Sequence, residues 1–370
     1  MQRNAELVCA FHGDGCPIFG AFFAPKVGIA QSATAPAHLL GLLILFRDHE
    51  TASSICVQSA AYLSKLAAMT RKLEYSVLDV FAEHPLQGNP LAVFHDARSL
   101  TSEEMQALAR ETNLAETTFI VPGDDPEIER THGVRVRIFT TQEELPFAGH
   151  PTLGTASWLY FNHPTLRGAE SITLLLGVGP ITVRFTPRSE GELGVHATMK
   201  QNDPVFGNTY PRAEIAAALG LQEADLLAGF QPQTVSTGLA FCIVPLRSID
   251  VLRSLMISQR EATAWLAQSD AKFFYCIAPT EQTIGTQWHA RMQFYGGEDP
   301  ATGSAAGCCI SWFVRHGLAH TGEPVVIEQG IEILRPSRIT AQASLVEDQV
   351  RYVQVSGRTI PVATGAFFLP

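Results

Sequence analysis

Two turns that contain glycine and proline each carry side chains able to take part in acid/base chemistry. The first reads LPFAGHPTLGTASWLY over residues 145–160, and the second reads GGEDPATGSAAGCCISWF over residues 296–313. Each turn leads into small and apolar residues with no polar face, a pattern that predicts a buried helix at the centre of its own domain. His150, Asp299 and Ser304 lie where these two predicted helices begin.

The two helix starts together have the properties of an anion site. A helix N-terminus has four unpaired N–H groups and a partial positive charge, so two converging ends would form a two-sided cradle. Gly149 and Gly303 would let a ligand approach the backbone closely. The alternatives are that Asp299 and Ser304 are ordinary helix caps and that His150 is a hydrogen-bonded turn residue. Residue types alone leave both interpretations open.

The two segments also resemble each other. The pattern P-x-x-G-[ST]-A occurs at 151–156 and again at 300–305, which indicates internal duplication. We prefer the register that pairs Gly149-His150 with Gly303-Ser304, because it places a glycine followed by a side-chain donor at both helix starts.

A candidate base precedes a predicted strand. Glu116 stands between Ala115 and Thr117, just ahead of an apolar run. A carboxylate at the edge of a buried strand is either a loop charge or a base whose proton affinity is raised by partial burial.

The rest of the pattern predicts an α+β fold with largely antiparallel sheets, because many strands are mixed with few helices. A helix is expected from Ser102, taken as its N-cap, to Glu111, and another over 212–219. Strands are expected at 75–81, 91–94, 117–121, 134–139, 172–176, 181–185, 241–245, 272–278, 290–294, 324–328 and 350–355.

Composition excludes several classes of protein. A chain of 370 residues has the length of two domains, and its net charge of −10 argues against nucleic-acid or anionic-membrane partners. The apolar run Leu39–Phe46 is far shorter than a membrane span. Seven cysteines without C-x-x-C spacing favour a reducing compartment, the cytoplasm, over a disulfide framework or a zinc site. Cys308 and Cys309 are predicted to be buried.

Residues 1–68 form a separate question. They show little periodicity, and their composition matches neither a secretory signal nor an Arg-rich presequence. We expect this extension to lie outside the folded part of the protein, as a disordered or non-native segment, with the natural start at Met69.

The ordered part of the chain resembles the PhzF family, the phenazine-biosynthesis-like relatives of diaminopimelate epimerase. The resemblance covers about residues 73–370 and rests most specifically on the GHP and EDPATGSA motifs. The matching stretches are LDVFAEHPLQGNPLAVF, NLAETTF, IFTTQEELPFAGHPTLGTA, VSTGLAF, GGEDPATGSAAG and QGIEILRPSRI.

This resemblance implies two similar epimerase-like halves related by a pseudo-two-fold axis. Each half would be a curved, mostly antiparallel sheet around a central buried helix, with the active site between the halves. The expected domains are 73–188 and 189–355, with 356–370 as a C-terminal strand that returns to the first. The resemblance also implies a homodimer and the absence of any metal or organic cofactor.

The family's functional residues carry over by motif. Its general acid/base glutamate falls on Glu116, and the polar partners fall on His150, Asp299 and Ser304. The backbone that binds a substrate carboxylate falls on Gly149, Gly303 and again Ser304. The implied reaction is a proton shift on a small carboxylate, as on the dihydro-hydroxyanthranilate ring in the phenazine enzymes.

One departure separates this chain from the epimerase relatives, which use two opposed cysteines at the helix starts. The corresponding positions are Ala148 and Thr302, so one-base chemistry is expected. The alternative function is a catalytically idle binding protein on the same scaffold. Loss of Glu116 or His150 would favour that alternative, and both residues are present.

Overall fold

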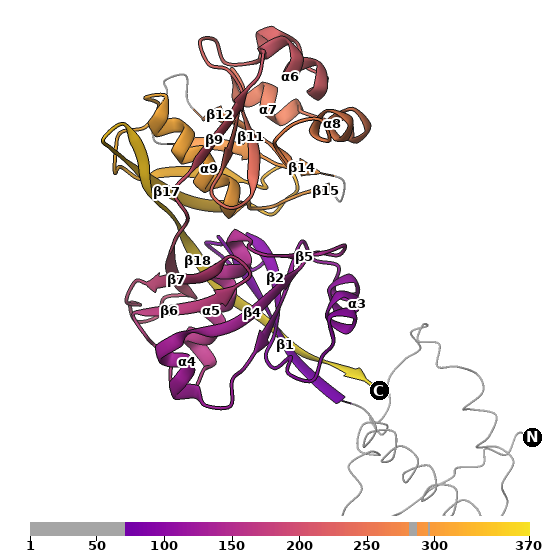
Figure 1. Cartoon of the computed structure of the whole chain (residues 1–370), viewed down its shortest axis with the longest axis vertical. Helices are drawn as coiled ribbons and strands as arrows, with labels where there is room; N and C mark the ends of the chain where they lie inside the picture. The colour runs from indigo at the N-terminus through magenta and orange to yellow at the C-terminus, as the bar shows by residue number, and fades with distance from the viewer. Residues whose placement is uncertain (1–70, 281–286, 295–296) are drawn as a thin grey trace, which may run out of the picture. The chain divides into compact units, whose positions relative to one another are not determined.

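The computed structural model describes residues 71–280, 287–294 and 297–370, all within one unit, Thr70–Pro370 (Figure 1). The expectations for residues 1–68 and for a start at Met69 lie outside the described residues, as does the run Leu39–Phe46. None of the helices in the described part is long and apolar enough to cross a membrane.

Strands dominate the described residues. The strands are β1 (Arg71–Val80), β2 (Asn89–Phe94), β3 (Thr117–Val121), β4 (Val134–Phe139), β5 (Glu144–Leu145), β6 (Ser171–Leu176), β7 (Gly179–Phe185), β8 (Val195–Lys200), β9 (Val205–Thr209), β10 (Gln233–Ser236), β11 (Ala240–Pro245), β12 (Phe273–Pro279), β13 (Gln287–Arg291), β14 (Gln293–Phe294), β15 (Gly297–Glu298), β16 (Val325–Gln329), β17 (Ser337–Val346) and β18 (Gln349–Leu369). The helices are α3 (Ser102–Thr112), α4 (Pro126–His132), α5 (Gly149–Asn162), α6 (Arg212–Leu219), α7 (Ile249–Ser254), α8 (Gln259–Leu266) and α9 (Gly303–Arg315), with a 3-10 turn η1 (Glu223–Asp225).

The strands form a mixed sheet that one long strand holds together. Its order is β1-β2-β3-β4-β6-β7-β8-β18-β17-β16-β13-β12-β11-β10-β9, with β5 beside β4. Most pairs are antiparallel; β2–β3, β4–β6, β11–β12 and β13–β16 are parallel. Strand β18 pairs with β17 and β8 in its first part and with β1 over residues 359–369, which closes the first eight strands of this order into a ring.

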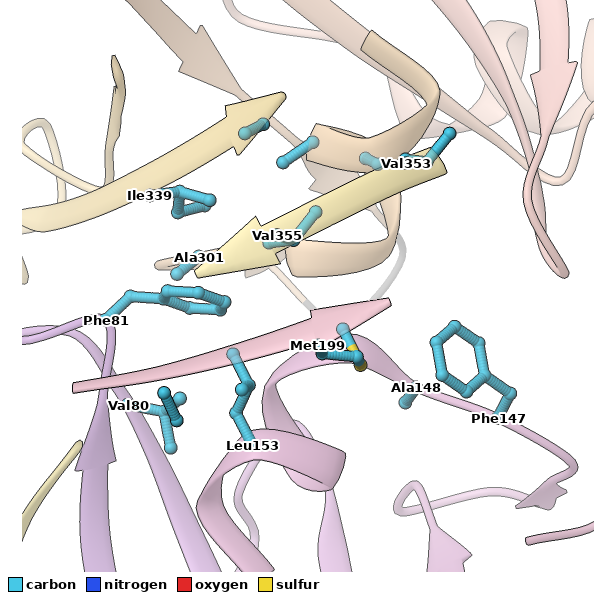
Figure 2. Packing of buried hydrophobic residues seen from close by; sticks show 14 of the residues in the cluster. Val80, Phe81, Phe147, Ala148, Leu153, Met199, Ala301, Ile339, Val353 and Val355 are labelled. Atoms are coloured by element: carbon cyan, nitrogen blue, oxygen red, sulfur yellow. The ribbon is translucent and has the colours of Figure 1, made fainter. Parts of the chain in front are cut away.

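Two helices without a polar face pack against this sheet. Helix α5 contacts β1, β2, β6 and β8, whereas α9 contacts β17, β18, β11 and β10 (Figure 1). Every residue of α9 from Gly303 to Val314 is buried. Both helices contribute to one hydrophobic cluster, part of which is drawn in Figure 2 with Leu153 of α5, Val355 of β18 and the fully buried Phe81. The prediction that Cys308 and Cys309 are buried is confirmed.

Several predicted boundaries need correction. Helix α3 is capped by Thr101 and not by Ser102, because Thr101 and Glu104 form a reciprocal capping box. The strand expected at 290–294 is two elements: β13 ends at Arg291, and Gln293 and Phe294 pair with β15. The last strand runs far beyond the expected 350–355, because three different strands supply its partners.

Candidate active site

A cavity of about 330 Å³ lies where the N-termini of α5 and α9 meet. All six residues singled out from the sequence line it: Glu116, Gly149, His150, Asp299, Gly303 and Ser304. Its other walls are largely apolar and include Leu145, Leu239, Phe241, Phe273, Met292 and Phe294. A small, mostly apolar cavity with a few converging polar groups is the usual form of a small-molecule site.

The two helix starts approach each other to backbone contact. Helix α5 begins at Gly149 and α9 begins at Gly303, and neither helix has a side-chain cap on its first amides. A Cβ atom on Gly149 would lie 2.5 Å from the backbone nitrogen of Ser304, so only glycine fits there. The amides of both first turns therefore border the same space, where their partial positive charge favours an anion.

The capping alternative for Asp299 and Ser304 is wrong, because Thr302 is the N-cap residue of α9 and no side chain caps that helix. The Asp299 carboxyl instead accepts hydrogen bonds from the hydroxyl of Thr302 and from the amide of Asn89, both at 2.6 Å. Asp299 is 8% exposed, and its burial raises the pKa of the carboxyl to about 6.

Glu116 ends the loop before β3 and turns its carboxyl toward α5. The side chain is 17% exposed, and its Oε2 atom is buried without a hydrogen-bond partner, 3.6 Å from His150 Nε2. Desolvation raises the pKa of Glu116 well above its ordinary value, and the nearby Asp299 carboxylate adds to the rise. Such a carboxyl retains a proton at a pH where an exposed glutamate would have lost it.

His150 is the second residue of α5 and is almost completely buried. Its Nδ1 atom lies 3.2 Å from the side-chain nitrogen of Asn89, and its Nε2 atom has no hydrogen-bond partner. Burial lowers the pKa of His150 to about 3, so the ring is neutral near pH 7. The His150–Glu116 contact is therefore not an ion pair of a charged imidazolium with a carboxylate.

The sequence analysis missed residues that hold this arrangement in place. Asn89, the first residue of β2, lies in a Gly-Asn-Pro segment that reads as a connecting loop, yet it contacts both His150 and Asp299. Gln329 accepts from the backbone N–H of Thr302 and donates to the Asp299 carbonyl. Gln201 donates to the Gly303 carbonyl at 2.9 Å. No local pattern marks any of these three side chains.

An ion pair stands at the edge of the cavity. Lys272, just before β12, donates to Glu143, in the loop before β5, at 2.8 Å. Both side chains are substantially exposed, so the pair contributes little to stability. Among the described residues, no group of three or more His, Cys, Asp or Glu side chains is arranged to hold a metal ion.

Comparison with known proteins gives the class of protein first. The solved structures most similar in fold include a predicted epimerase from Pseudomonas aeruginosa, 37% identical, with a TM-score of 0.68 over 80% of this chain and 99% of that one. A hydroxyproline epimerase from Agrobacterium vitis shares the fold at 10% identity and a TM-score of 0.56, covering 81% of this chain and 93% of that one. The fold is thus a sheet-dominated, epimerase-like one.

The family follows from the sequence. The model of the phenazine biosynthesis-like proteins, PhzC-PhzF, matches residues 78–365, and the chain belongs to this family. A Pseudomonas aeruginosa relative named trans-2,3-dihydro-3-hydroxyanthranilate isomerase is 38% identical over 80% of this chain and 99% of its own length. A Pseudomonas fluorescens relative of the same name is 36% identical, covering 80% of this chain and 99% of its own. The chain is an isomerase, and the resemblance inferred from the motifs is confirmed.

Proposed function

We propose that this isomerase shifts a proton between two carbon atoms of a small, cyclic carboxylate, with Glu116 as the single general acid/base and without a cofactor. The class of substrate is that of the relatives named trans-2,3-dihydro-3-hydroxyanthranilate isomerase. The observation that carries the proposal is the Glu116 carboxyl, buried without a hydrogen-bond partner beside His150 at the junction of two uncapped helix N-termini.

The proton balance requires one residue in two roles. Glu116 as a carboxylate removes a proton from one substrate carbon, and the resulting carboxylic acid returns the proton to another carbon. The raised pKa of Glu116 supports this cycle, because a carboxylate with a higher proton affinity is a stronger base toward a substrate carbon than an exposed glutamate.

The other site residues are assigned to binding and charge stabilisation. The backbone of Gly149, Gly303 and Ser304 at the two helix starts is proposed to hold the substrate carboxylate. Neutral His150 is proposed to stabilise the negative charge that develops on the substrate when its proton leaves. The buried Asp299 carboxylate is proposed to assist catalysis by raising the proton affinity of Glu116 and by holding the side chains of Asn89 and Thr302. The apolar walls of the cavity suit the ring, since they exclude water from the reacting carbon atoms.

One-base chemistry is supported by the residues that precede the two helices. Ala148 and Thr302 are the N-cap residues of α5 and α9, and neither carries a thiol. Cys308 and Cys309 are fully buried farther along α9. Two-base exchange through opposed cysteines therefore has no thiol pair at the helix starts.

We also propose the larger organisation that accompanies this function in the family. The domains 73–188 and 189–355 are proposed to be pseudo-symmetric halves, each around a central helix, with 356–370 returning to the first. The recurrence of two parallel strand pairs on each side of β18 supports this division. A homodimer is proposed as the working assembly, which light scattering in solution would test.

The test is a Glu116→Gln variant, with Glu111→Gln on the exposed end of α3 as the matched control. In D₂O, the wild type and the control are expected to exchange deuterium into trans-2,3-dihydro-3-hydroxyanthranilate while isomerising it. The Glu116→Gln variant is expected to bind a non-reactive hydroxyanthranilate analogue but to lose exchange by at least about 10²-fold. Exchange by this variant at the wild-type rate would refute the role of Glu116. No exchange by the wild type with any cyclic carboxylate would favour a binding protein.

A further inference from the structure

The side-chain amide of Asn89 contacts residues at the N-terminal ends of both α5 and α9. Asn89 is fully buried, and its Nδ2 atom lies 2.6 Å from Asp299 Oδ1, 3.0 Å from the Ala301 carbonyl oxygen and 3.2 Å from His150 Nδ1. The Ala301 carbonyl can only accept a hydrogen bond. The group beside it must therefore be the NH₂ of Asn89 and not its oxygen, which settles the orientation of the amide.

This orientation determines which ring nitrogen of His150 carries a hydrogen. An NH₂ group faces His150 Nδ1 at 3.2 Å, and a hydrogen on Nδ1 would point at the hydrogens of that group. The favourable arrangement is a bare Nδ1 that accepts. A neutral imidazole carries its one hydrogen on the other nitrogen, Nε2.

We propose that Asn89 is a positioning residue, which fixes neutral His150 as the tautomer protonated at Nε2 and so aims a ring N–H at Glu116. The Nε2 atom lies 3.6 Å from Glu116 Oε2, beyond hydrogen-bond distance, and both residues line the cavity. His150 then donates to a substrate group and does not compete with the substrate for the proton of Glu116. Only this catalytic consequence rests on the proposed function; the tautomer itself does not.

The residues just before Asn89 are held in place by close packing and by Arg335. Gly88, just before it, has a φ of +68°, and a Cβ atom there would lie 2.3 Å from the carbonyl oxygen of Val80. Arg335 donates to the carbonyls of Gln87 and Gly88 and to the Asp79 carboxylate. The amide is therefore anchored before any substrate binds, which positioning of His150 requires.

The charged groups around the ring are few. Glu116 faces Nε2, and Asp299 shares the Asn89 amide with Nδ1. The third acceptor near Asn89 Nδ2, the Ala301 carbonyl, is uncharged, and the three acceptors share the two hydrogens of the NH₂ group. The low pKa of His150 agrees with this environment, because burial outweighs the two carboxyl groups.

The test is ¹⁵N NMR of the full chain with ¹⁵N-labelled histidine, because a bare and a protonated ring nitrogen have widely separated shifts. The His150 signals are assigned by their loss in a His150→Gln variant. Wild type is expected to show one neutral tautomer, protonated at Nε2, from pH 6 to 8. An Nδ1-protonated ring or an imidazolium in that range would overturn the proposal, whatever the activity.

A variant separates positioning from simple packing. Asn89→Asp replaces the NH₂ that faces Nδ1 with an acceptor, so at pH 8 the ring is expected to become protonated at Nδ1 and kcat to fall at least about tenfold. The matched control is Asn162→Asp at the exposed far end of α5, which should leave the His150 signals unchanged. A folded Asn89→Asp variant with the wild-type tautomer would also overturn the proposal. If only the proposed function were wrong, the Asn89→Asp variant would still show the changed tautomer, but its kcat would not differ from that of the wild type.

Discussion

Replacing Gly149 with alanine would force apart the two helix starts that form the candidate anion site. The new Cβ atom would lie 2.5 Å from the Ser304 nitrogen, 2.8 Å from the Gly303 carbonyl carbon and 3.0 Å from its Cα atom. All three neighbours are backbone atoms at the first turn of α9. No side-chain rotation relieves the overlap, so one helix start must move relative to the other.

The size of the effect follows from that overlap. Ordinary contacts begin at 3.4 Å, so the gap must open by about 0.9 Å. A misplacement of about 1 Å in a catalytic site costs about 10²-fold in rate, or about 2.7 kcal/mol in transition-state stabilisation. Overpacking in a filled interior costs about 1–3 kcal/mol of folding free energy. The variant is thus expected to fold and to lose about a hundredfold in kcat/KM.

The assay is kcat/KM for the isomerisation of trans-2,3-dihydro-3-hydroxyanthranilate, with stability measured by chemical denaturation. Gly154→Ala is the matched control, because its Cβ atom would lie 2.5 Å from Leu91 Cδ2 and 2.9 Å from Val80 Cγ2, which are side-chain atoms. The control should lose about 1–3 kcal/mol of stability yet keep kcat/KM within about threefold. Equal losses of kcat/KM in both variants, or none in Gly149→Ala, would refute the reasoning.

Two further predictions concern buried titratable groups. Burial raises the pKa of Asp299 to about 6, so the folded state binds the proton of this carboxyl more tightly than the unfolded state does. The unfolding free energy should therefore fall by up to about 3 kcal/mol as the pH rises from about 4 to 6. An Asp299→Asn variant should flatten this decline in denaturation curves measured across that range; an unchanged slope would contradict the assignment. Glu129 contacts the buried His163 at 3.0 Å and accepts a hydrogen bond from the backbone N–H of Gly123 at 2.8 Å. A Glu129→Ala variant should therefore lose about 1–3 kcal/mol of stability with little change in kcat. A loss of activity without destabilisation would contradict this structural role.

The local sequence pattern was sufficient to predict many helices and strands and the positions where the two central helices begin. The bounds of β3, β4 and α6 agree with the ranges predicted from apolar periodicity, because neighbours along the chain decide such elements. Glycines followed by small, apolar residues predicted that α5 and α9 begin at Gly149 and Gly303. The same motifs were specific enough to identify the family.

The tertiary structure decided what depends on partners far away in the chain. Strand β18 extends over 21 residues because β17, β8 and β1 each supply hydrogen-bond partners. The sequence of β18 alone does not indicate these partners. The amide of Asn89 reaches groups 61, 210 and 212 residues away, so no spacing rule could mark it. The pKa values of Glu116 and His150 likewise depend on burial by residues from several elements. Residue types set which chemistry was available, whereas desolvation and long-range contacts decided where each proton resides.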